Sequence, residues 1–106
     1  MGAFDLSDLA ELIKNRAQAT SDNSYTRSLL DAGIDQICKK FGEESIELII
    51  AAQNKNSRPI ISEAADVIYH MLVLLQHSNV ALSDVLSELE RRTAQSGHAE
   101  KASRPK

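Results

Sequence analysis

Apolar residues recur every three or four positions along most of the chain, a spacing typical of one face of an α-helix. Prolines are few and turn-forming residues are grouped, so the pattern divides into long segments. The expected helices cover residues 5–19, 34–54, 59–78 and 83–94. The stretch from Thr20 to Gly33 lacks this periodicity and predicts a loop or a single helical turn. The predicted fold class is therefore all-α, an antiparallel bundle of about four helices.

The helix expected at 34–54 is apolar on two separate sides. One broad stripe includes Phe41 and Leu48, and a second flank contains Ile46 and Ile50. A helix with two apolar sides needs two neighbours, while a chain of 106 residues can build only a small core. We therefore expect a homodimer, in which a second copy completes the bundle.

The helix expected at 59–78 is apolar around most of its circumference. Its one narrow polar stripe holds Glu63, Asp66, His70 and His77. Such a helix is expected to be central and to face something charged. His70 has three competing interpretations: a partner of a metal-binding carboxylate, a substrate contact, or a histidine packed in the core.

The last predicted helix begins after Ser83, which can cap it. We expect residues 1–95 to form one all-α domain and residues 96–106 a polar C-terminal tail. Because the tail has no core-forming residues, it either lacks fixed structure or closes over a ligand.

Composition narrows the class of protein. Hydrophobic residues make up 42% of the chain, which excludes a disordered protein, and a net charge of −3 indicates no nucleic-acid partner. No apolar run approaches the roughly 18 residues of a membrane span, and the first residues lack the features of a signal peptide. The single cysteine, Cys38, lies in an apolar stripe and is expected to pack there, which suits a reducing, cytoplasmic setting.

Two acidic pairs interrupt the apolar helices. Glu44 and Glu47 are three residues apart, as are Glu63 and Asp66, and this spacing places each pair on one helix face. Counted from the turn between the helices, the pairs lie at similar levels and can meet. Converging carboxylates repel one another unless a cation lies among them, and Mg²⁺ or Mn²⁺ prefers such oxygen ligands. A solvated acidic face is the alternative, but burying unpaired carboxylates in an apolar helix is unfavourable.

The segment before the second long helix offers groups for phosphate. Tyr25, Arg27 and the neighbouring hydroxyl groups can contact phosphate oxygens. The alternative is a connector in which Tyr25 only packs. Composition alone favours the connector.

Residues 39–47 (KKFGEESIE) together with 63–66 (EAAD) resemble the signature of the all-α nucleotide pyrophosphatases, the MazG-like superfamily. Within it, the chain most resembles the family of phosphoribosyl-ATP pyrophosphatases of histidine biosynthesis. This narrower likeness rests on residues 24–26 (SYT), the compact length and residues 96–104 (SGHAEKASR). The acidic motif indicates the superfamily, whereas the loop and the tail indicate the family.

The resemblance implies Mg²⁺-dependent hydrolysis of phosphoribosyl-ATP to phosphoribosyl-AMP and pyrophosphate, the second step of histidine biosynthesis. By motif position, the metal ligands would be Glu44, Glu47, Glu63 and Asp66. The catalytic candidates are Glu43, Glu44 and Glu47, with Glu43 as a base or a neighbour of the ligands and Glu47 as the alternative group that orients the water. The candidates for substrate binding are Tyr25, Arg27, Lys40, Lys101 and Arg104.

Two other functions remain open at this point. A house-cleaning pyrophosphatase of the same superfamily would use the same metal on dNTPs. A non-catalytic helical dimerisation module would carry the acids as ordinary surface, and it predicts no effect of Mg²⁺ on thermal stability.

Overall fold

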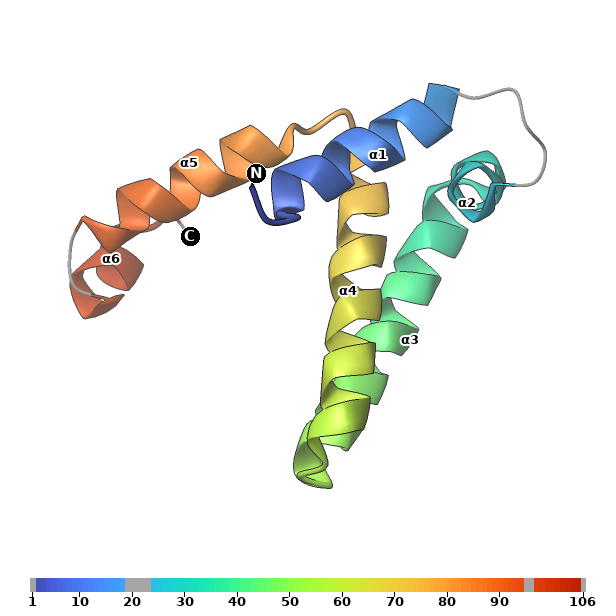
Figure 1. The fold of residues 1–106 in the computed structure, drawn as a ribbon. Coiled ribbons are helices and arrows are strands. Elements are labelled where there is room, and N and C mark those ends of the chain that lie inside the picture. Colours follow the sequence, from blue (N-terminus) through green and yellow to red (C-terminus); the bar gives the residue numbers. More distant parts are fainter. Residues whose placement is uncertain (1, 19–23, 95–96, 106) are drawn as a thin grey trace.

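The structure is a computed structural model and describes residues 2–18, 24–94 and 97–105. Within these residues every regular element is an α-helix, which confirms the predicted fold class (Figure 1). Four helices match the predicted segments to within two residues at each end, and two short helices are additional. The helices are α1 (Leu6–Gln18), α2 (Tyr25–Ala32), α3 (Ile34–Gln53), α4 (Ser57–His77), α5 (Leu82–Thr93) and α6 (Gly97–Ser103).

The helices α3 and α4 form the most extensive helix pair and run antiparallel as a hairpin (Figure 1). The chain reverses direction at Lys55, which has a positive φ of 59° and whose backbone N–H donates to the Ala52 carbonyl at 3.1 Å. Asn56 then caps α4, because its side chain accepts a hydrogen bond from the backbone N–H of Arg58 at 3.3 Å. This short connection sets the two acidic pairs at similar levels.

The helix α2 corrects the prediction of a loop or a single turn between Thr20 and Gly33. Ser24 caps it by accepting a hydrogen bond from the backbone N–H of Arg27 at 3.3 Å, and Gly33 ends it with a φ of 96°. Thr26 and Leu29 bury one face of this two-turn helix against its neighbours. Packing therefore stabilises a segment too short to show helical periodicity. The first part of that segment, residues 20–23, lies outside the described residues.

The core lies where α1 and α2 cross the end of the α3–α4 hairpin (Figure 1). Its fully buried side chains come from all four of these helices, so the core also fixes their relative positions. They are Ile13, Leu29, Ile37, Leu72 and Val73.

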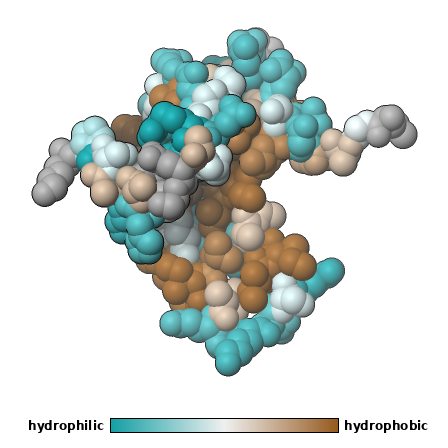
Figure 2. Space-filling model, turned by 90° about the vertical axis from the view of Figure 1, so that its left-hand side faces the viewer, coloured by the Kyte–Doolittle hydropathy of each residue, from teal (hydrophilic) through white to brown (hydrophobic). Residues whose placement is uncertain are grey.

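The opposite end of the hairpin carries exposed apolar side chains. Ile46, Ile49 and Ile50 on α3 and Ile61 on α4 are each more than half exposed in the single chain. Figure 2 shows hydrophobic surface over the lower part of the molecule, which Figure 1 identifies as this hairpin. Cys38 is also exposed, so the prediction that it packs in the core is wrong for the single chain.

The last two helices follow the C-terminal end of α4, which is the end of the hairpin near the core (Figure 1). The helix α5 begins at Leu82 with Ala81 as the capping residue and no side-chain cap, so the prediction that Ser83 caps it is wrong. Residues 97–103 form α6, although composition alone allowed a tail without fixed structure. The predicted boundary at 95–96 lies outside the described residues. No helix among those described is long and apolar enough to cross a membrane.

Candidate metal centre

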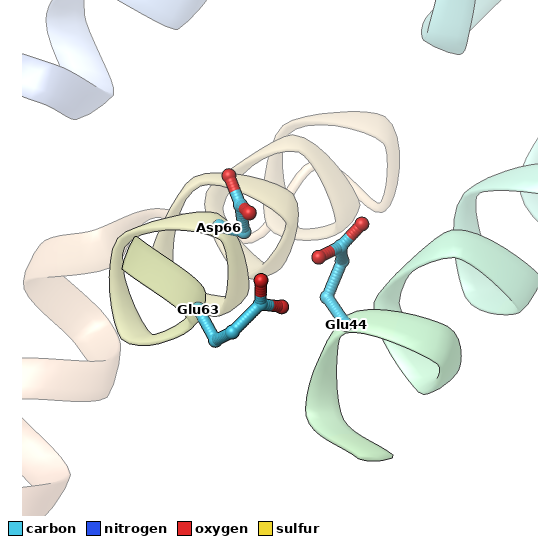
Figure 3. Close-up of side chains that lie close together, drawn as sticks. All are labelled: Glu44, Glu63 and Asp66. Atoms are coloured by element: carbon cyan, nitrogen blue, oxygen red, sulfur yellow. The ribbon is translucent and has the colours of Figure 1, made fainter. Parts of the chain in front are cut away.

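Three carboxylates from the α3–α4 hairpin converge on one point. Glu44 projects from α3, and Glu63 and Asp66 project from the facing side of α4 (Figure 3). Each offers an oxygen atom, and these three oxygens all lie within 4.8 Å of one another. All three side chains are half-buried. The pairing of the two acidic motifs therefore follows from the register of the hairpin.

The surroundings of Glu63 strongly disfavour the charged form of its carboxyl group. Its Oε2 atom is buried and has no hydrogen-bond partner among the described residues. A hydrogen bond with the Glu47 carboxyl, followed by burial and by the charges of Glu47, Glu44 and Asp66, raises the pKa of Glu63 from 4.5 to about 7. Two carboxyl groups share a hydrogen bond only when one carries a proton. The site therefore favours an added proton or a cation.

Glu44 shows the same effect more weakly. Burial, followed by the negative charges of Glu47 and Asp66, raises the pKa of its carboxyl group above 4.5. A divalent cation would remove this repulsion and provide the missing partner for Glu63 Oε2. The donor set consists only of carboxylate oxygens, which fits Mg²⁺ or Mn²⁺ better than a soft metal.

Glu47 and Glu43 occupy different positions on α3. Glu47 is exposed and lies beside Glu63 at the edge of the cluster, outside the group of three converging oxygens. Glu43 is exposed and forms an ion pair with Lys40, with 3.8 Å between Lys40 Nζ and Glu43 Oε1. The hairpin thus brings three of the four predicted ligands together, with the fourth adjacent, and holds Glu43 against Lys40.

Tyr25 lies beside the cluster, at the first turn of α2. Its hydroxyl group is 3.0 Å from His70 Nε2, and Lys40, Glu44 and Asp66 all act electrostatically on it. Burial is the main cause that raises the pKa of Tyr25 above 10.0. Of the three interpretations of His70, the structure supports a buried histidine, which also hydrogen-bonds the Asp66 carbonyl.

The other predicted substrate contacts have different positions. Arg27 ties α2 to its surroundings, because its Nη1 donates to the Ala17 carbonyl at 2.9 Å and its Nε pairs with Asp31 at 3.1 Å. Lys101 lies on α6 and Arg104 directly follows it, on an arm that points away from the α3–α4 hairpin in Figure 1. The single chain therefore brings neither of these two to the carboxylates.

One polar contact beside the site is missed by the sequence patterns. Thr26 is fully buried, and its Oγ1 hydrogen-bonds the hydroxyl group of Tyr69 on α4. The sequence signals for this segment were the SYT motif at 24–26 and the candidate phosphate-binding groups, and neither pointed to Tyr69. No periodicity relates residues that far apart, so their pairing emerges only from the fold.

The α3–α4 hairpin thus gathers carboxylates that could hold a divalent cation, as the resemblance to the all-α nucleotide pyrophosphatases predicted. The family model for phosphoribosyl-ATP pyrophosphohydrolase matches residues 6–93. The chain therefore belongs to the phosphoribosyl-ATP pyrophosphohydrolase family, as the sequence resemblance predicted.

Relatives with the corresponding name align with this chain over nearly their whole length. Proteins named phosphoribosyl-ATP pyrophosphatase share 50% identity with the chain in Agrobacterium fabrum, 52% in Azorhizobium caulinodans and 48% in Methylobacterium nodulans. The alignments cover 99%, 93% and 98% of this chain and 98%, 91% and 97% of those proteins, in the same order. The interpretation of the chain as a hydrolase of this family is confirmed.

Proposed function

We propose that the chain hydrolyses phosphoribosyl-ATP to phosphoribosyl-AMP and pyrophosphate, the second step of histidine biosynthesis. The observation that carries this proposal is the convergence of one oxygen each from Glu44, Glu63 and Asp66 within 4.8 Å, in a member of this family. In the part of the chain that the structure describes, Glu63 Oε2 is also buried without a hydrogen-bond partner. An acidic cluster that lacks a partner suits a reaction whose substrate arrives as a metal-bound polyphosphate.

The proposed ligands of Mg²⁺, or of Mn²⁺ in its place, are Glu44, Glu63 and Asp66, with Glu47 at the edge of the cluster. When bound, the ion neutralises charge on the polyphosphate and increases the acidity of water near it. The exposed position of Glu47 beside Glu63 supports a role for its carboxylate in orienting the attacking water or accepting its proton. Glu43 is retained as the alternative base, held by its ion pair with Lys40.

The substrate-binding residues divide into two groups. Lys40 and Tyr25 lie near the carboxylates in the same chain. The ammonium group of Lys40 can contact phosphate oxygens, and the exposed ring of Tyr25 can contact the base or ribose of the nucleotide. Arg27 holds α2 and supports the position of Tyr25. Lys101 and Arg104 remain candidates only if a second copy of the chain supplies them, because their own arm points away from the hairpin (Figure 1).

We also propose that the working form is a homodimer, acting in the cytoplasm. The support is the exposed apolar surface on the hairpin, where Ile46, Ile49, Ile50 and Ile61 would otherwise face water. Covering this surface with the same surface of a second copy provides the neighbour that the two-sided α3 requires. The hairpin that carries the carboxylates would then be stabilised from both sides.

The decisive experiment measures pyrophosphate release from phosphoribosyl-ATP by the purified chain, with and without Mg²⁺. We expect metal-dependent release, and we expect Asp66→Asn to lower it by about 100-fold or more because one ligand charge is lost. Glu11→Gln, on the exposed side of α1, is the matched control and should retain activity.

Parallel reactions with dNTPs separate the proposed substrate from the superfamily alternative. Cleavage of dNTPs without release from phosphoribosyl-ATP would keep the metal centre and reassign the substrate. Absence of release from both substrates, with the helical circular dichroism spectrum intact, would refute the enzymatic proposal and favour the dimerisation module.

A further inference from the structure

Two polar contacts fasten the first turn of α2 to α4 beside the carboxylates. The Tyr25 hydroxyl group lies 3.0 Å from His70 Nε2, and Thr26 Oγ1 hydrogen-bonds the Tyr69 hydroxyl group. The rings of Tyr25 and Tyr69 are also stacked, with centroids 6.0 Å apart and an interplanar angle of 21°. These contacts link consecutive residues of one helix to consecutive residues of another.

The hydrogen bonds of His70 determine which of its ring nitrogens carries the proton. Nδ1 lies 2.7 Å from the Asp66 backbone carbonyl oxygen, which can only accept a hydrogen bond. Nδ1 is therefore the donor, and in a neutral imidazole Nε2 is then the acceptor. It follows that the Tyr25 hydroxyl group donates its proton to Nε2.

Burial differs sharply between the two partners. His70 is only 5% exposed, whereas Tyr25 is 52% exposed. Glu63, Asp66 and His70 follow one another on a single stripe of α4, so the buried imidazole lies one turn beyond the carboxylates. His70 is thus the buried partner of this hydrogen bond, and Tyr25 is the exposed partner at the edge of the carboxylate cluster.

We propose that His70 is a positioning residue that holds the Tyr25 ring at the edge of the carboxylate cluster, ready to contact the base or ribose of the nucleotide substrate. This inference rests on the function proposed above. An exposed tyrosine loses side-chain freedom when it contacts a ligand. Because the hydrogen bond to His70 orders the ring before binding, it reduces this loss and lowers KM.

A measurement on the wild-type protein tests the geometry without any turnover. Nitrogen NMR of the His70 ring in the folded protein is expected to show a protonated Nδ1 and an unprotonated Nε2 that accepts a hydrogen bond. A proton on Nε2 in the neutral ring would overturn the proposal, because Tyr25 would then lose its acceptor. This readout remains valid even if the chain acts on another substrate.

Variants then test the consequence for binding. Tyr25→Phe removes the donor, and His70→Asn keeps an amide near the Nδ1 position but lacks an acceptor at the Nε2 position. Each is expected to raise KM about threefold to tenfold, the effect of one ordinary hydrogen bond, with kcat nearly unchanged. His70→Gln places an amide oxygen near the Nε2 position and should restore much of the affinity. His77→Asn, on the exposed last turn of α4, is the matched control.

The double variant Tyr25→Phe/His70→Asn decides whether the two residues act as a unit. We expect it to be no worse than either single variant, because both remove the same hydrogen bond. A wild-type KM in folded Tyr25→Phe, or additive losses in the double variant, would overturn the proposal. Failure of the proposed reaction is recognised separately, since the wild-type protein itself would then release no pyrophosphate.

Discussion

Replacing Glu63 with glutamine should make the metal-free protein more stable while abolishing its response to Mg²⁺. In the wild-type protein, Glu63 Oε2 is buried and has no hydrogen-bond partner within the described ranges, and the charges of Glu47, Glu44 and Asp66 act on this carboxyl group. An uncharged amide of nearly the same shape removes one negative charge and adds N–H donors for the neighbouring carboxylates. The same change deletes a proposed metal ligand. Stability and metal response are therefore expected to move in opposite directions.

The sign of the pH dependence follows from the Glu63 pKa. Its value rises from 4.5 to about 7 on folding, so between these values the folded state binds more protons than the unfolded state. Stability without metal should therefore fall as pH rises from about 4.5 to about 7. Glu63→Gln lacks this titration, so its stability advantage should be largest above about pH 7 and should vanish at acidic pH.

The size of the metal effect follows from binding linkage. At a free Mg²⁺ concentration ten times the dissociation constant, binding to the folded state alone adds about 1.4 kcal/mol. For a domain of this size, that corresponds to a rise of roughly 6–11 °C in Tm. The assay is thermal unfolding followed by far-ultraviolet circular dichroism, at one protein concentration because association also raises Tm.

The matched control for this experiment is Glu11→Gln, which removes an exposed carboxylate from α1. It should behave as the wild-type protein in both metal-free and Mg²⁺-containing buffer. The reasoning would be refuted if Mg²⁺ left the wild-type Tm unchanged, or if Glu63→Gln responded to Mg²⁺ as strongly as the wild-type chain.

Two further predictions concern packing and assembly. Ile37→Ala should destabilise the protein by about 2–5 kcal/mol in urea unfolding, because Ile37 is fully buried where four helices meet; a loss well under 1 kcal/mol would contradict that core. Ile49→Asp should convert the proposed dimer to a helical monomer in light scattering. Phe4→Asp changes a residue that is even more exposed but lies outside the hairpin, and it should leave the protein dimeric. A monomeric wild-type protein would refute the proposed dimer.

The sequence was sufficient for the long helices and the acidic motifs. Helical periodicity is a local property, so α3 and α4 are predicted to within two residues at each end. The i, i+3 spacing likewise places Glu63 and Asp66 on one face before any tertiary structure is known. A turn too short for any other path makes the hairpin antiparallel, and this brings Glu44 to the facing side.

Only the tertiary structure decided what surrounds that cluster. The two-turn helix α2 depends on burial of Thr26 and Leu29, which its own sequence does not reveal. The exposure of Cys38 depends on which side of α3 the other helices cover. The hydrogen bond between Tyr25 and His70 joins residues that are 45 positions apart in the sequence. Periodicity constrains the faces of one helix, whereas these contacts depend on how several helices pack in space.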